Sequence, residues 1–221
     1  RRVLFRSRYY MHRHIALFDL DGVVFDTEPQ YTIFWGSQFK KYYPQEPGLE
    51  HKVKGMTLVQ IYDMYFNDQP QKQADITCEL NEFEVNMNFE YVAGFEQFIT
   101  KLRSIGVKTA VVTSSNREKM DNVYAKHPEF KTYFDEVLTS EDFAKSKPDP
   151  DCYLKAAQKF GANVDECVGF EDSFNGLKSL QGANMAIVGL ATTNSRKAIA
   201  EYAHKVIDNY VGINPSDLFF E

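Results

Sequence analysis

Two aspartates, Asp19 and Asp21, stand one residue apart at the end of the apolar segment 14–18. Short apolar runs of this kind are typical of buried strands in parallel sheets, and ligands of such sheets bind beyond the carboxyl ends of strands. Two adjacent carboxylates repel each other unless a cation or a proton relieves them. The pair therefore suits a divalent metal with a nucleophile and an acid/base partner. An ordinary Asp-Gly turn after a strand is an equally good explanation of this segment alone.

Three further polar clusters follow predicted strands or loops. In the segment 113–116, the hydroxyls of Thr113 and Ser114 and nearby backbone amides precede a helix, which is a natural anion cradle. Lys147, next to a proline, could neutralise a phosphate or hold a carboxylate. Glu171 and Asp172 form a second acidic pair, and such hard oxygen ligands suit Mg²⁺. Helix capping or a solvated loop explains each cluster singly, but the whole set on successive strand ends indicates one site.

The chain divides into a helical block and an alternating part. Apolar and aromatic residues recur at helical spacing within residues 28–91, where Thr27 is the predicted N-cap of the first helix and the stripes are expected to form a core. From residue 94 onward helices alternate with strands, which predicts an α/β fold with a parallel sheet and right-handed crossovers. The first strand must join this sheet. We therefore expect a core of residues 11–27 and 92–221, with residues 28–91 inserted as a helical lid.

The expected boundaries are as follows. Beyond the first strand, we predict strands at 107–113, 136–139, 166–170 and 185–188. The helices of the alternating part are predicted at 95–102, 116–125, 151–160, 174–180 and 196–202.

Composition excludes several classes of protein. The 221 residues are 43% hydrophobic and 25% charged, which is typical of a globular protein and not of a disordered one. A net charge of −6 argues against nonspecific nucleic-acid binding. No apolar run approaches the roughly 20 residues that span a bilayer. Three widely spaced cysteines suggest neither a disulfide framework nor a zinc site, so we expect reduced thiols in a cytoplasmic protein and take a monomer as the default.

Residues 1–10 are treated separately. The stretch Arg1–Ser7 resembles the in-frame translation of a sequencing adapter more than a genuine basic arm or a targeting peptide. We therefore expect residues 1–10 to be a non-native extension and Met11 to be a sensible start.

The ordered motifs resemble those of one enzyme superfamily. Asp-x-Asp-Gly at 19–22, a strand-end threonine at 113, Lys-Pro at 147–148 and Glu-Asp-Ser at 171–173 resemble the haloacid dehalogenase superfamily. The similarity covers essentially residues 14–210 and is greatest to the beta-phosphoglucomutase-like phosphatases, whose helical C1 cap follows the first strand. This resemblance implies a Rossmann-like parallel core with helices on both faces. It also implies a Mg²⁺-dependent enzyme that acts on a small phosphorylated metabolite.

The resemblance implies a role for each motif residue. Asp19 would be the nucleophile that forms an aspartyl phosphate, and Asp21 would be the acid/base that protonates the leaving oxygen and later deprotonates water. The implied metal ligands are Asp19, Asp21 through its backbone carbonyl, Asp172 and, in a supporting place, Glu171. The implied phosphate-binding groups are Thr113, Lys147 and the amides of Leu20, Asp21 and Ser114.

Two positions in the predicted lid bear on the reaction type. Mutases of this group carry a histidine on the first lid helix and an arginine shortly after a Lys-Gly pair. Here Tyr31 stands at the histidine position, and Leu58 follows Lys54-Gly55 at the arginine position. Both differences favour a phosphatase over a hexose-phosphate mutase, and the resemblance implies a sugar phosphate as its substrate. A non-catalytic binding module on this fold is a third alternative, and a dehalogenase would leave Asp21 and the metal pair without a task.

Overall fold

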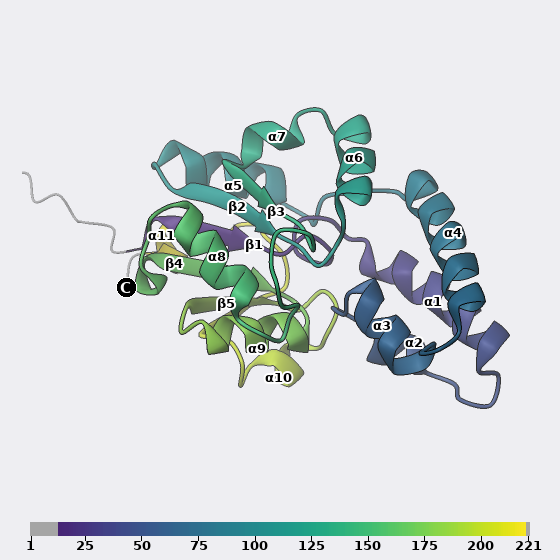
Figure 1. Cartoon of the computed structure of the whole chain (residues 1–221). Coiled ribbons are helices and arrows are strands. Elements are labelled where there is room, and N and C mark those ends of the chain that lie inside the picture. The colour runs from purple at the N-terminus through teal and green to yellow at the C-terminus, as the bar shows by residue number, and fades with distance from the viewer. Residues whose placement is uncertain (1–12, 220–221) are drawn as a thin grey trace, which may run out of the picture.

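A parallel sheet forms the centre of the larger part of the molecule (Figure 1). The computed structural model describes residues 13–219, and in them six strands are ordered β3-β2-β1-β4-β5-β6. The strands are β1 (Ile15–Phe18), β2 (Lys108–Val112), β3 (Glu136–Leu138), β4 (Cys167–Glu171), β5 (Ala186–Leu190) and β6 (Lys205–Ile207). β1 lies between β2 and β4, with Phe18 in register with Val111 and Phe170. The predicted α/β class with a parallel sheet is confirmed.

Helices cover both faces of the sheet because β1 buries side chains on both. Ala16 and Phe18 point to the face that is covered by α5, α6, α7 and α11. Ile15 and Leu17 point to the opposite face, against α8, α9 and α10. The helices of this part are α5 (Phe95–Ser104), α6 (Arg117–Lys126), α7 (Phe130–Tyr133), α8 (Asp151–Lys159), α9 (Phe174–Gly182), α10 (Arg196–Ile199) and α11 (Ser216–Phe219), with a 3₁₀ turn at Val164–Glu166.

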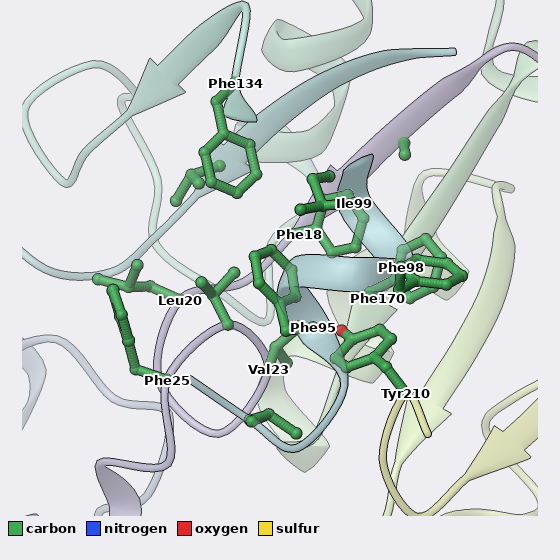
Figure 2. Close-up of a cluster of buried hydrophobic side chains, with 14 of the residues drawn as sticks. Phe18, Leu20, Val23, Phe25, Phe95, Phe98, Ile99, Phe134, Phe170 and Tyr210 are labelled. Atoms are coloured by element: carbon green, nitrogen blue, oxygen red, sulfur yellow. The ribbon is translucent and has the colours of Figure 1, made fainter. Parts of the chain in front are cut away.

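Aromatic rings pack beneath the ends of the central strands (Figure 2). The rings of Phe18 and Phe170 stack with centroids 4.4 Å apart, and Phe95 meets Phe18 edge-on at 5.9 Å. Phe98 and Tyr210 close the cluster on the far side. Because Phe18 and Phe170 each precede an acidic residue, this rigid layer fixes the backbone from which those carboxylates project.

A helical cap lies beyond the carboxyl ends of β1, β2 and β4 (Figure 1). Its helices are α1 (Glu28–Tyr42), α2 (Leu49–Lys52), α3 (Leu58–Tyr65) and α4 (Pro70–Asn86). Phe34, Trp35, Phe39 and Phe66 belong to a separate buried cluster, which confirms that the aromatic stripes build a core. The cap is inserted after β1, as expected, and α4 packs against α6 of the sheet domain.

Several local predictions need correction. Thr27 does not cap α1: its backbone is helical, its side chain makes no capping bond, and its hydroxyl donates to Asp21 instead. β6, α2, α7 and α11 were not predicted, because three or four residues carry too little periodicity to identify an element. β5 extends to Leu190, and α10 ends at Ile199 rather than at 202.

Two expectations concern the whole chain. Within residues 13–219, no helix is both long and apolar enough to cross a bilayer. The three cysteines are free thiols, as expected. The predicted extension at residues 1–10 lies outside the described residues.

Candidate active site

The carboxyl ends of β1, β2 and β4 bring the predicted polar residues to one pocket. Asp19 follows β1, Thr113 follows β2, and Asp172 follows β4. Together with Lys147 they line a cavity of about 510 Å³, whose opposite wall is the cap. Parallel strands place their carboxyl ends at one edge of the sheet. Strands β2 and β3 lie on one side of β1, and β4, β5 and β6 lie on the other, so the strand order changes direction at β1.

Lys147 lies at the centre of this arrangement and is 2% exposed. Its Nζ donates to Asp19 Oδ1 at 2.7 Å, to Glu171 Oε1 at 2.7 Å and to the carbonyl of Val112 at 2.9 Å. Burial disfavours the ammonium, but the two carboxylates outweigh burial and hold the pKa of Lys147 above its usual range. Lys147 is therefore charged, and its three donors are all used to link β1, β2 and β4.

Three carboxylates form a candidate metal centre. Ligand oxygens of Asp19, Glu171 and Asp172 lie within 4.8 Å of one another. Burial raises the pKa of Asp19 to about 7, with Lys147 opposing the rise and the neighbouring carboxylates adding to it. Burial, and then the carboxylates of Glu28, Asp19 and Glu171, raise the pKa of Asp172 well above its usual range. A divalent cation bound to these oxygens would relieve both the desolvation and the repulsion.

Glycines make room for the acidic residues. Gly22 adopts a positive φ of 77°, and a Cβ there would lie 2.1 Å from Asp172 Oδ2. A Cβ on Gly176 would lie 1.9 Å from the Glu171 carboxylate. The donor set and the space around it therefore fit a hard cation with oxygen ligands.

Glu171 is more deeply placed than the other acids and is fully buried. Its Oε1 accepts from Lys147 and, at 2.6 Å, from the hydroxyl of Tyr153 on α8. Because two donors already hold Oε1, the first task of Glu171 is to orient Lys147. The supporting place at the metal that the resemblance implies for Glu171 stays a prediction.

Asp21 is held by donors on both carboxylate oxygens. Thr27 donates to Oδ1 at 2.5 Å, and Ser115 donates to Oδ2 at 3.2 Å. Lys119 Nζ contacts Oδ1 at 2.6 Å and Oδ2 at 2.5 Å. Lys119 is 1% exposed although it lies on α6, and nothing in the local sequence distinguishes it from surface lysines.

The segment after β2 offers groups suited to an oxyanion. Ser114 Oγ is buried without a hydrogen-bond partner among the described residues. Thr113 is 1% exposed, and its Oγ1 accepts from the amide of Ser115 at 3.0 Å. A buried hydroxyl without a partner is costly unless a ligand completes it. Leu20, whose amide was also predicted to face phosphate, is buried in the turn after β1.

The cap closes the pocket through polar contacts. Tyr31 donates to Glu84 Oε1 at 2.7 Å, and Lys54 Nζ lies 3.9 Å from Glu28 Oε2. Burial raises the pKa of Glu28 to about 7, and Asp21 adds to the rise. Gln60 of α3 donates to the carbonyl of Lys147 at 2.8 Å, so that a cap helix contacts the backbone of this buried lysine. Glu28, Gln60 and Glu84 belong to no recognisable motif and were not predicted as site residues.

The cap loop also approaches the sheet domain closely. Gly55 has a φ of +72°, and a Cβ there would lie 2.6 Å from the hydroxyl of Ser173. Only glycine combines this backbone conformation with this approach. The cap is therefore in a closed position over the three carboxylates.

The comparisons with known proteins identify the family of this chain. The model of the haloacid dehalogenase-like hydrolases matches residues 16–190, which include every residue of the pocket named above. The chain belongs to this family. This match confirms the superfamily that the sequence motifs predicted.

Individual relatives match over different lengths. Protein SUPPRESSOR OF QUENCHING 1, chloroplastic, from Arabidopsis thaliana is 31% identical over 54% of this chain, but the chain spans only 11% of that protein. A protein of Drosophila melanogaster named "Probable pseudouridine-5'-phosphatase" is 25% identical, with 90% of this chain and 91% of the relative aligned. A solved hydrolase of the family from Entamoeba histolytica superposes with a TM-score of 0.80 at 20% identity, covering 94% of this chain and all of that one. This structural likeness shows the fold alone.

Proposed function

We propose that this family member is a Mg²⁺-dependent phosphatase that hydrolyses a small phosphorylated metabolite, of which a sugar phosphate is the best candidate, through a phosphorylated Asp19. The observation that carries the proposal is the contact of Asp19 with Lys147 beside two further carboxylates, in a pocket that the cap covers. The full-length similarity to a relative named as a phosphatase supports it.

In the first half-reaction, an oxygen of Asp19 attacks phosphorus and the ester P–O bond breaks. For this step Asp21 must carry a proton when the substrate arrives. It donates this proton to the leaving oxygen, so that an alcohol departs. Lys147 and the Ser114 hydroxyl stabilise the charge on the phosphoryl oxygens, which is the main requirement of phosphoryl transfer. Thr113 supports this cradle from the end of β2.

In the second half-reaction, water attacks the phosphorus of the phosphorylated Asp19. Asp21 accepts a proton from this water, and the P–O bond to Asp19 breaks with its electron pair returning to the carboxylate. The products are inorganic phosphate and the starting form of Asp19. The closed cap limits other water from entering the pocket.

Mg²⁺ is the cofactor that fits the oxygen donors. Asp19, Asp172 and the backbone carbonyl of Asp21 would hold it, with Glu171 supporting the site. When bound, it lowers the repulsion between the nucleophile and a phosphate dianion and orients both. Lys147 alone neutralises too little charge for this group of acids.

The cap favours hydrolysis over isomerisation. Tyr31 and Leu58 line the cap side of the pocket where mutases of the group carry histidine and arginine. Glu28 and Glu84 are carboxyl groups in the same wall, and in their ionised form they oppose a second phosphate. We therefore expect a monophosphate ester whose alcohol part faces the cap.

A paired assay separates the two reaction types. With Mg²⁺ and a panel of sugar monophosphates, we expect release of inorganic phosphate in proportion to the alcohol that is formed. The readouts are phosphate by dye binding and sugar phosphate isomers by chromatography. Isomerisation with little phosphate release would favour the mutase, and tight binding without turnover across the panel would favour a binding module.

Binding of Mg²⁺ is expected to weaken below about pH 7. The raised pKa of Asp19, about 7, means that this carboxyl keeps its proton there and that a cation must displace it. The loss is about tenfold per pH unit for one displaced proton. Without the cation, the same shift lowers stability as pH rises from about 4 to 7, since only the unfolded chain has lost the proton.

Calorimetric titration with MgCl₂ at pH 5.5 and 7.5 measures this dependence. The Asp63→Asn variant, which changes an exposed aspartate of α3, is the matched control and should behave as the wild type. Equal affinity at the two pH values would contradict the protonation of Asp19 in the metal-free protein.

A further inference from the structure

Lys119 is a buried cation that the reaction steps above do not use. It lies on α6, is 1% exposed, and is not among the residues that line the pocket. In the closed state its ammonium is surrounded by Asp21, Ser115 and the Tyr31 ring. A buried ammonium without a task would cost stability, so its contacts indicate what it does.

Its contacts lead in two directions. Toward the sheet, Nζ binds both oxygens of Asp21, and Ser115 Oγ lies 3.1 Å away. Toward the cap, Nζ lies 4.5 Å from the centroid of the Tyr31 ring, and the Tyr31 hydroxyl donates to Glu84. Lys119 thus joins the acid/base of the sheet domain to two helices of the cap.

We infer that Lys119 is a positioning residue that fixes the orientation of the Asp21 carboxylate when the cap is closed. The inference rests on the proposed phosphatase function. An aspartate has two soft side-chain torsions, and a donor on each oxygen removes the freedom of the carboxylate to rotate. Misplacement of a reacting group by about 1 Å can cost about 10²-fold in rate.

Side chains of the cap complete the surroundings of Lys119. Tyr31 of α1 covers the ammonium of Lys119 and is itself bound to Glu84 of α4, the cap helix that packs against α6. With the cap open, water would solvate the ammonium of Lys119 and weaken its interaction with Asp21. Closure over a substrate therefore also aligns the acid/base.

A leaving-group comparison tests the inference. For Lys119→Met we expect kcat on an alkyl phosphate to fall about 10²-fold, because an alkoxide cannot leave without a proton from Asp21. On p-nitrophenyl phosphate, the burst of nitrophenolate reports the first half-reaction alone, before Asp21 acts as the base. The rate of this burst is expected to fall less than about tenfold, since nitrophenolate leaves unprotonated. A merely structural defect would lower both rates alike, and that result would overturn the inference.

A double-mutant cycle gives a second readout. In an Asp21→Asn background, Lys119→Met should lower the residual rate on the alkyl phosphate by no more than about threefold, because the group it positions is gone. Independent, multiplying losses would overturn the inference. Lys131→Met, which removes an exposed lysine 4.2 Å from the Tyr124 ring on the outer surface, is the matched control for loss of a lysine over an aromatic ring.

Folding and function are separated as follows. Thermal unfolding is recorded for every variant, and Lys119→Gln replaces Lys119→Met in the same cycle if the methionine variant does not fold. If the wild type releases phosphate but the two substitutions have independent effects in the cycle, only the role of Lys119 is rejected. Absence of phosphate release from the wild type, over the whole substrate panel, rejects the proposed function and this inference with it.

Discussion

Replacement of Asp19 by asparagine is expected to abolish phosphate release, with a loss of about 10⁴-fold or more, the scale that follows removal of a covalent nucleophile. The amide is isosteric, but it is a poor nucleophile and carries no charge for a metal. Phosphate release is measured with Mg²⁺ on the best substrate of the panel. Retained turnover in this variant would contradict the assignment of Asp19.

The same substitution should leave folding intact. Asp19 is crowded by Glu171, Asp172 and Asp21, so a neutral side chain relieves repulsion in the metal-free protein. Its melting temperature without Mg²⁺ is therefore expected to equal or exceed that of the wild type, while its stabilisation by Mg²⁺ should be lost. Asp63→Asn again serves as the control for an aspartate outside the site.

Replacement of Lys147 by methionine is expected to damage both stability and activity. Two carboxylates lose their shared partner, and the fully buried Glu171 is left without an ammonium. Breaking a buried pair in this way costs about 3–5 kcal/mol of unfolding free energy. Loss of a cation that stabilises the phosphoryl charge should lower kcat by a further 10²–10³-fold, roughly the cost of removing one such group.

Two companion variants make this result specific. Lys145→Met, two residues away, removes an exposed lysine that pairs with Asp149 and should change stability by less than about 0.5 kcal/mol. Adding Glu171→Gln to Lys147→Met should recover part of the lost stability, because the unpaired buried charge is removed as well. Urea unfolding measures all three, and a Lys147→Met protein as stable as the wild type would refute the buried network.

The sequence was sufficient for the architecture because its strands are short apolar runs that end in polar residues. In a parallel sheet such ends share one edge, so Asp19, Thr113 and Asp172 could be placed together before any coordinates were seen. Lys147 was assigned to the same site because it belongs to the Lys-Pro motif, and not because it follows a predicted strand. The roles of these residues, the domain boundaries, a monomeric state and a cytoplasmic location stay predictions.

What the sequence could not supply depends on contacts between distant segments. Lys119 stands three residues after the N-cap Asn116, a place where most lysines face solvent, and it is covered by Tyr31 from the distant cap segment of the chain. Thr27 has the sequence signature of an N-cap, yet its hydroxyl bonds more favourably to the charged Asp21. Glu84 is the charged member of the buried face of α4, beside Ile76 and Leu80, and it lines the pocket.

Trapping of the phosphorylated enzyme tests the central claim most directly. In Asp21→Asn with p-nitrophenyl phosphate, the first step needs no acid while the second lacks its base, so the intermediate should accumulate. We expect a burst of about one nitrophenolate per enzyme and, after acid quenching and peptide mapping, phosphate on the Asp19 peptide. Phosphate on another residue, or continued phosphate release with Asp19 unlabelled, would contradict the account.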